Sequence, residues 1–125
     1  MLPFGGQGTN QAIEDGGAIG FLLVNVDNDT QLPQRLQLFD QLRRRRASRI
    51  QILSSVRASR ESVVEEKIKP FMEDGVIFPN SFPARVSHDA GFDVYARSQE
   101  MLQLLFNSGD GEMFLDHQTT SSIKA

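Results

Sequence analysis

Three glycines inside one predicted helix limit most strongly what this chain can fold into. From about residue 10 to residue 24, apolar and glycine residues recur at helical spacing, which predicts a helix with one smooth side. That side comprises Ala12, Ile13, Gly16, Gly17, Gly20, Leu23 and Val24. Each interior glycine costs about 1 kcal/mol relative to alanine. We therefore expect this helix to need a closely approaching partner along its smooth side.

A glycine-rich turn, residues 3–8, leads into this helix, and Thr9 and Asn10 are residue types that favour the N-cap position. Glycine lets the main chain come close to a ligand, and the first N–H groups of a helix stabilise negative charge. Such a turn can therefore bind an electron-rich oxygen. Turns of this kind also occur as plain connections, so the pattern alone leaves both interpretations open.

A second helix is predicted over residues 32–56, with Pro33 at a tolerated first-turn position. Its apolar stripe comprises Leu36, Phe39, Ala47, Ile50 and Leu53. Arg43 and Arg46 fall within the same stripe, so we expect them to meet partner groups. Four consecutive arginines, residues 43–46, point around most of a helix, which favours a solvated, partly paired helix over a nucleic-acid site.

The remaining chain reads as two further helices and two irregular segments. A helical stretch is expected over residues 61–72 with Val64, Ile68 and Met72 in register, and a last helix runs from an Asp93 cap through Phe106. The apolar side of the last helix comprises Val94, Met101, Leu102 and Leu105. Residues 76–92 are expected to form an irregular connection, and residues 107–125 a disordered polar tail. Core filling is expected of Phe71, Met72, Ile77, Phe78 and Phe82.

These elements predict a mainly α fold of three to four helices, with one domain over residues 1–106. The 125 residues include no cysteine, which excludes disulfides, thiolate metal sites and a cysteine nucleophile. His88 and His117 lack metal-ligand spacing, so no metal site is expected. The formal charge of −3 and the absence of a long apolar run predict an intracellular, cytoplasmic protein that binds neither nucleic acid nor membrane.

Residues 3–15 match the pattern P-x-x-G-Q-G-x-N-x-x-x-x-D, with Pro3, Gly6, Gln7, Gly8 and Asn10 at its key positions. This pattern resembles the flavin-binding segment of single-component FAD-dependent aromatic hydroxylases of the salicylate-hydroxylase-like group. The resemblance continues through residues 39–46, which look like that family's aromatic-acid-x-x-R-x-x-R helix, and residues 92–95, which look like its late Y-D-V segment. It covers residues 3 to about 105.

The resemblance implies the C-terminal helical part of an α/β FAD-binding monooxygenase fold, from a family that uses FAD and NAD(P)H. It assigns the isoalloxazine side of the FAD site to Pro3, Gly6, Gln7, Gly8, Thr9 and Asn10. Glu14 and Asp15 are expected to make structural contacts and to favour the helix start, and no residue is assigned a catalytic role.

The family's G-x-G-x-x-G dinucleotide fold and its upstream G-D motif have no counterpart before the turn. We therefore expect an N-terminally truncated, partial FAD site that is inactive alone. A homo-oligomer or a complementing N-terminal chain is an expected partner. The alternative is a small helical interaction or scaffold protein that has lost flavin chemistry.

Overall fold

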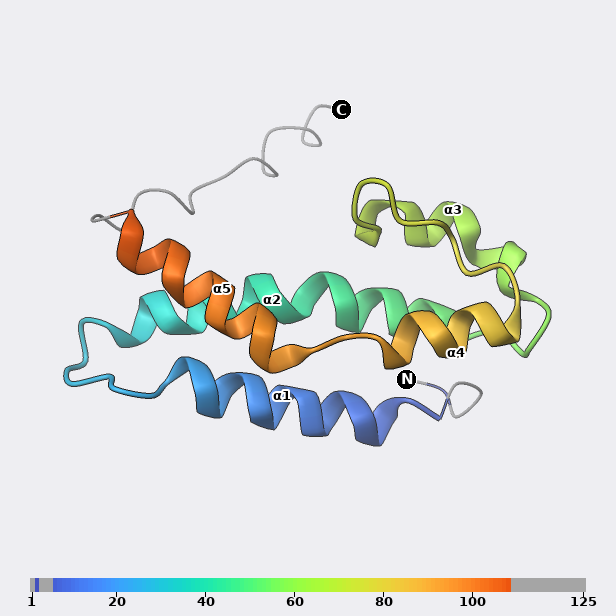
Figure 1. Cartoon of the computed structure of the whole chain (residues 1–125). Coiled ribbons are helices and arrows are strands. Elements are labelled where there is room, and N and C mark those ends of the chain that lie inside the picture. Colours follow the sequence, from blue (N-terminus) through green and yellow to red (C-terminus); the bar gives the residue numbers. More distant parts are fainter. Residues whose placement is uncertain (1, 3–5, 109–125) are drawn as a thin grey trace, which may run out of the picture.

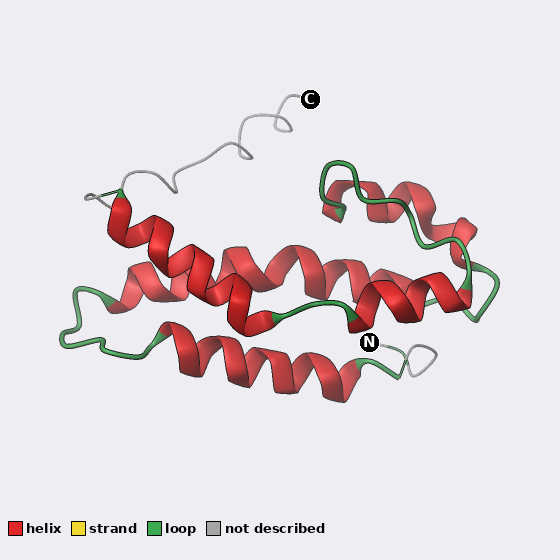
Figure 2. Ribbon diagram, viewed as in Figure 1, coloured by secondary structure: helices red, strands yellow, loops and turns green. Residues whose placement is uncertain are grey.

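The computed structural model describes residue 2 and residues 6–108, and within them the chain is helical with no strand (Figures 1 and 2). The α-helices are α1 (Gly8–Leu22), α2 (Leu32–Leu53), α3 (Glu65–Ile68), α4 (Phe82–Ala90) and α5 (Val94–Asn107). Two short 3-10 helices, η2 (Glu61–Val64) and η3 (Lys69–Phe71), flank α3. The mainly α class is confirmed, with five α-helices described rather than three to four.

Helix α1 packs against both α2 and α5, while the η2–α3–η3 segment packs on the other end of α2 (Figure 1). Two apolar clusters follow from this arrangement. The first comprises Ala18, Leu22, Leu38, Leu42, Val94 and Leu105, and the second comprises Leu53, Val64 and Ile68. Because α2 contributes to both clusters, it is the element that joins the two ends of the fold. None of the described helices is both long enough and apolar enough to span a bilayer.

Helix α1 forms where the sequence predicts it, but the side that it buries is different. Ile13 is 68% exposed and Val24 56% exposed, whereas the buried residues are Gln11, Ala18 and Leu22. The predicted smooth side was therefore wrong, because the buried side carries polar residues whose partners lie on α2. Gly17 alone of the three helix glycines has a close neighbour, since a Cβ there would lie 3.2 Å from Tyr95 Oη.

Helix α2 begins at Leu32 with proline in its first turn, as predicted, and ends at Leu53 rather than near residue 56. Leu38 and Leu42 are buried, while Leu36 of the predicted stripe is 42% exposed. The buried side also contains four arginines, namely Arg35, Arg43, Arg46 and Arg49. The predicted stripe is confirmed at Ile50 and Leu53, which are fully buried, and wrong at Leu36; the buried side of α2 is more charged than apolar residues alone indicate.

Residues 61–71 are helical, close to the expected 61–72, but in three short pieces, with Val64 and Ile68 buried. The prediction of an irregular connection over residues 76–92 was wrong for its second half, which forms α4. Ser81 caps this helix, accepting a hydrogen bond from Ala84 N at 3.4 Å. Its inward residues, Arg85 and Asp89, are charged, so apolar periodicity did not reveal it.

The apolar residues of this region are only partly buried. Phe78 and Met72 pack against the second apolar cluster, as expected. Ile77, in contrast, is 87% exposed and Phe82 is 43% exposed, so the prediction of core filling was wrong for both. In α4 the outward side is thus apolar and the inward side charged, the reverse of an ordinary surface helix.

Of the predicted helices, α5 agrees most closely with its predicted cap, bounds and apolar side. Asp93 Oδ1 accepts hydrogen bonds from Tyr95 N and Ala96 N, both at 3.0 Å, which is an ordinary N-cap arrangement. Val94 and Leu105 are buried, and the other two predicted residues of the apolar side pack beside them. The helix ends at Asn107, and the predicted tail beyond residue 108 lies outside the described residues.

Candidate functional site

The glycine turn (residues 6–10) ends in the first turn of α1. Gly6 has φ of 60°, in the left-handed region that favours glycine, and the helix begins two residues later at Gly8. Gln11 N donates to Gln7 O at 2.9 Å, and Asn10 Nδ2 donates to Gln7 Oε1 at 3.2 Å. Thr9 and Asn10 therefore lie inside the helix, so their prediction as N-caps was wrong. Pro3 lies outside the described residues.

The start of α1 has hydrogen-bond donors to offer. The first N–H groups of a helix have no carbonyl partner within it, and Gln7 at the N-cap supplies no side-chain acceptor. The first turn contains no acidic residue either. Gly8, Thr9 and Asn10 are exposed, and a Cβ added at Gly6 or Gly8 would meet no atom of the described residues within 4 Å. This donor set and open space fit an electron-rich oxygen of a ligand.

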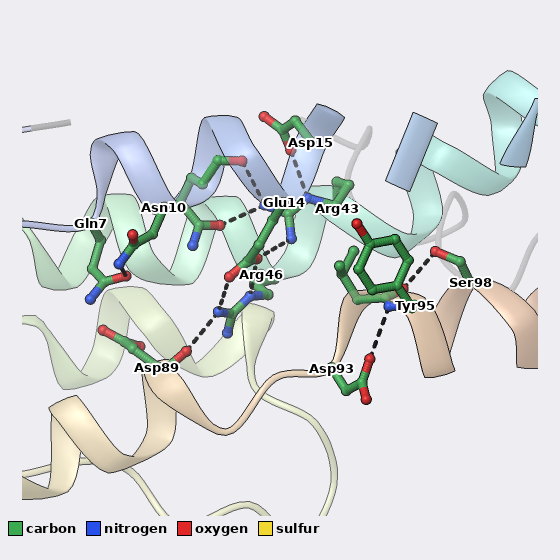
Figure 3. Close-up of polar contacts among 12 residues, drawn as sticks. Gln7, Asn10, Glu14, Asp15, Arg43, Arg46, Asp89, Asp93, Tyr95 and Ser98 are labelled. Carbon is green, nitrogen blue, oxygen red and sulfur yellow. Dashed lines mark hydrogen bonds and ion pairs between the residues drawn. The ribbon is translucent and has the colours of Figure 1, made fainter. Parts of the chain in front are cut away.

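Further along α1 than the turn, Arg43 of α2 binds three residues of that helix, Gln11, Glu14 and Asp15 (Figure 3). Its Nη2 donates to Gln11 Oε1 at 2.7 Å and to Gln11 O at 3.4 Å. Its Nη1 lies 2.6 Å from Glu14 Oε2, and its Nε lies 2.6 Å from Asp15 Oδ1. The Arg43 side chain is only 4% exposed, so its contacts with Gln11 and Glu14 are largely shielded from water, whereas Asp15 is 47% exposed.

Arg46, one turn further along α2, joins three helices. Its Nε donates to Glu14 Oε2 and its Nη2 to Glu14 Oε1, both at 2.7 Å, in a bidentate pair (Figure 3). The same Nη2 donates to Asp89 O of α4 at 2.8 Å. The guanidinium also lies 4.2 Å from the centre of the Phe92 ring, in a cation–π contact. Arg46 thus holds α1 and α4 against α2.

Glu14 is the carboxylate shared by both arginines. Burial raises the pKa of Glu14, but the hydrogen bonds and charges of Arg46 and Arg43 outweigh it and bring the pKa below the usual value of 4.5. Glu14 is therefore ionised at neutral pH and neutralises part of the positive charge of α2. The expectation that Glu14 and Asp15 make structural contacts is confirmed by the ion pairs, whereas neither residue lies in the first turn of α1.

The arginine run was predicted to form a solvated, partly paired helix, and this was right only in part. Arg44 is exposed and pairs with Asp40 at 2.7 Å, but Arg43 and Arg46 are buried. Burial, together with the nearby Arg46, lowers the pKa of Arg49, which donates to Phe71 O at 3.3 Å. The expectation that Arg43 and Arg46 meet partner groups is confirmed.

Sequence reasoning missed three contributors to this arrangement: Gln11, Asp89 and Phe92. Gln11 and Asp89 are polar residues on buried helix sides, which apolar periodicity does not identify.

His88 Nδ1 lies 3.2 Å from Asp89 Oδ1. The described residues contain no cluster of three or more side chains suited to a metal ion.

The chain is 39% identical over 105 residues to the FAD-dependent monooxygenase phomE of Diaporthe leptostromiformis, which covers 84% of this chain and 28% of that protein. It is 37% identical over 94 residues to the FAD-dependent monooxygenase cfoG of Aspergillus candidus, which covers 75% of this chain and 21% of that protein. No family model and no solved structure matches it. The chain thus spans about a quarter of the length of these relatives, and its similarity to them supports a relationship to FAD-dependent monooxygenases.

Proposed function

We propose that this chain forms the isoalloxazine side of the FAD site of a salicylate-hydroxylase-like aromatic monooxygenase. The observation that carries the proposal is the open glycine turn, in which exposed Gly6 precedes, and exposed Gly8 begins, a helix without a side-chain cap. The similarity of most of the chain to proteins named FAD-dependent monooxygenases adds support. The residues proposed to contact the cofactor are Pro3, Gly6, Gln7, Gly8, Thr9 and Asn10.

Bound FAD would supply the redox chemistry, and the chain's own residues would bind and orient it. Gly6 and Gly8 leave room for a ligand next to the main chain. The free N–H groups at the start of α1 donate hydrogen bonds where the helix dipole is positive, which favours the electron-rich pyrimidine edge of a flavin. The role of the turn is therefore to hold negative charge at that edge.

The site is proposed to be partial, with the ADP and ribityl contacts supplied by polypeptide other than these residues. In support, the chain matches only 28% and 21% of the two relatives named above. We expect the purified chain alone to retain no FAD and to show no NAD(P)H-dependent hydroxylation. Fluorescence titration with FAD checks this, and stoichiometric flavin retention would contradict the partial-site proposal.

A chimera tests whether the segment serves FAD. In the Diaporthe leptostromiformis protein, the matching segment is replaced by this chain, and bound FAD is measured by absorbance after gel filtration. We expect the chimera to retain FAD. A folded chimera without FAD, as judged by circular dichroism, would refute the assignment.

Two glycine substitutions provide a matched pair within that chimera. Among the described residues of this chain, a Cβ at Gly8 or at Gly16 meets nothing within 4 Å, so we expect both alanine variants to fold. Gly8→Ala places a methyl group beside the helix N-terminus and should weaken FAD binding at least about tenfold, since it separates donors from their acceptor. Gly16→Ala lies two turns away and should change it less than about twofold. Equal effects would place the flavin elsewhere.

A second candidate function, a small helical interaction protein, is favoured by α4. Phe82 is 43% exposed and Val86 46% exposed, one helical turn apart, so that helix presents apolar surface outward. A homo-oligomer or a complementing N-terminal chain would cover such a surface. Sedimentation velocity separates the two functions, because a defined flavin-free dimer supports the interaction protein and a monomer that contributes to FAD binding in the chimera supports the flavin site.

A further inference from the structure

We propose that Arg43, acting through Gln11, fixes the position of the glycine turn and is thus a positioning residue of the flavin site. The consequence for flavin rests on the proposed function, whereas the positional effect on the turn does not. Arg43 itself contacts no residue of the turn, so its action is indirect.

The contacts form a continuous path from α2 to the turn. Arg43 Nη2 donates to Gln11 Oε1 at 2.7 Å, and Gln11 N donates to Gln7 O at 2.9 Å. Gln7 Oε1 in turn accepts from Asn10 Nδ2 at 3.2 Å. Gln11 is therefore the residue through which a buried cation of α2 reaches the first turn of α1.

Other contacts of the turn give it little support. Gly6, Gly8, Thr9 and Asn10 are exposed, and the hydrogen bonds given above for the turn join it to itself or to Gln11. Helix α1 has no side-chain cap, in contrast to α4 and α5. Within the described chain, the placement of the turn thus depends on how firmly Gln11 is held.

Arg43 is itself firmly held. Its guanidinium has four acceptors on α1, is 4% exposed at the side chain, and lies 5.9 Å from the centre of the Phe92 ring. A planar guanidinium can serve several acceptors in fixed directions, which an ammonium group cannot. Its ion pairs with Glu14 and Asp15 fix the second turn of α1, while its bond to Gln11 fixes the first.

Gln11→Met separates these two contributions. It removes the Oε1 acceptor and keeps both ion pairs of Arg43, and it also removes Gln11 Nε2, a buried atom without a hydrogen-bond partner. The fold should therefore persist. Gln103→Met, at an exposed position on α5, is the matched control.

Amide hydrogen exchange of the 125-residue chain, followed by NMR, measures how firmly the start of α1 is held, without any flavin. We expect Gln11→Met to speed exchange at positions 11–13 about tenfold, since a hydrogen bond to a charged group is lost, and to leave exchange near Leu105 unchanged. Gln103→Met should change neither. The proposal is overturned if exchange at positions 11–13 is unaffected, if it rises equally throughout the chain, or if the unmodified chain shows no protection there.

Arg43→Lys is a second variant that keeps the charge. One ammonium group cannot satisfy Gln11, Glu14 and Asp15 together, so exchange at positions 11–13 should again rise about tenfold while the chain stays folded. Unchanged exchange in this variant would contradict the proposal. Arg44→Lys, at an exposed pair, is its control.

The same substitutions in the chimera test the consequence for flavin. Gln11→Met should weaken FAD binding about threefold to tenfold, and Gln103→Met should not. A chimera that never binds FAD would refute the proposed function while the exchange result stands. Normal FAD affinity in the Gln11→Met chimera, together with unchanged exchange, would refute the positioning role while the flavin site stands.

Discussion

The three interior glycines of α1, Gly16, Gly17 and Gly20, differ in their surroundings, and alanine substitution should reveal the difference. Gly16 and Gly20 face open space, so a methyl group at either position meets no atom within 4 Å. Alanine is favoured over glycine inside a helix by about 1 kcal/mol. Gly16→Ala and Gly20→Ala should each stabilise the isolated chain by about that amount and raise its melting temperature by about 4 °C or more.

Gly17 should respond differently because of one neighbour. A Cβ there would lie 3.2 Å from Tyr95 Oη and 3.5 Å from Tyr95 Cζ. Relieving this approach moves the Tyr95 ring, which makes an edge contact with Phe21 at a centroid distance of 6.2 Å. Such a contact contributes about 0.5–1.5 kcal/mol. The helix gain and the contact loss are of similar size, so Gly17→Ala should change stability by less than about 0.5 kcal/mol.

A double variant isolates the cause. Tyr95→Phe removes the hydroxyl and leaves ordinary contact distance, so Gly17→Ala in that background should gain about 1 kcal/mol. Thermal and urea unfolding, followed by far-UV circular dichroism, measure each difference. The reasoning is refuted if Gly17→Ala stabilises the Tyr95 chain as much as Gly16→Ala does. Destabilisation by Gly16→Ala in a chain shown to be monomeric by sedimentation would refute it as well.

Three further substitutions test the remaining structure. Glu14→Gln should cost about 3 kcal/mol at neutral pH by leaving Arg43 and Arg46 short of a buried partner. Burial raises the pKa of Glu14, but the two arginines lower it more, so it lies below 4.5. The stabilisation by Glu14 is therefore present above about pH 4.5 and lost as the pH falls further. The free energy of urea unfolding should depend less on pH in the variant than in the unmodified chain. Asp93→Ala removes the cap of α5 and should cost about 1 kcal/mol in thermal unfolding. Leu22→Ala empties a fully buried site and should cost about 2–5 kcal/mol in urea unfolding, and a smaller loss would show that the site collapses.

The sequence predicts helices well where cap and periodicity agree. Asp93 precedes a helix whose buried side is apolar, and α5 forms as expected. In α4 the buried residues are Arg85 and Asp89, so an apolar pattern points outward and the helix is missed. Gln11, a polar residue on the buried side of α1, was likewise missed by a pattern of apolar residues. Where cap and apolar side agree, a helix and its approximate bounds follow from local signals, whereas a helix with a charged buried side depends on partners elsewhere in the chain.

The candidate site is predictable to a similar degree. The turn and the need of Arg43 and Arg46 for partners can be read from local patterns. Their partners cannot, because Gln11 lies 32 positions from Arg43, and Asp89 lies 43 positions from Arg46. Only the packing of α1, α2 and α4 brings these groups together, so the charge arrangement behind the turn emerges from the folded chain.

The packing of α1 against α5 has a consequence for biosynthesis. Helix α1 is translated well before α5, so it finds one of its two main partners only when residues 94–107 have been translated. Until then Ala18 and Leu22 lack the apolar contacts that Val94 and Leu105 provide, and the nascent segment is a substrate for chaperones that bind exposed aliphatic side chains. Ribosome-stalled nascent chains that end before residue 94 should therefore be cleaved by protease within residues 8–22, and chains extended past residue 107 by the length of the exit tunnel should resist.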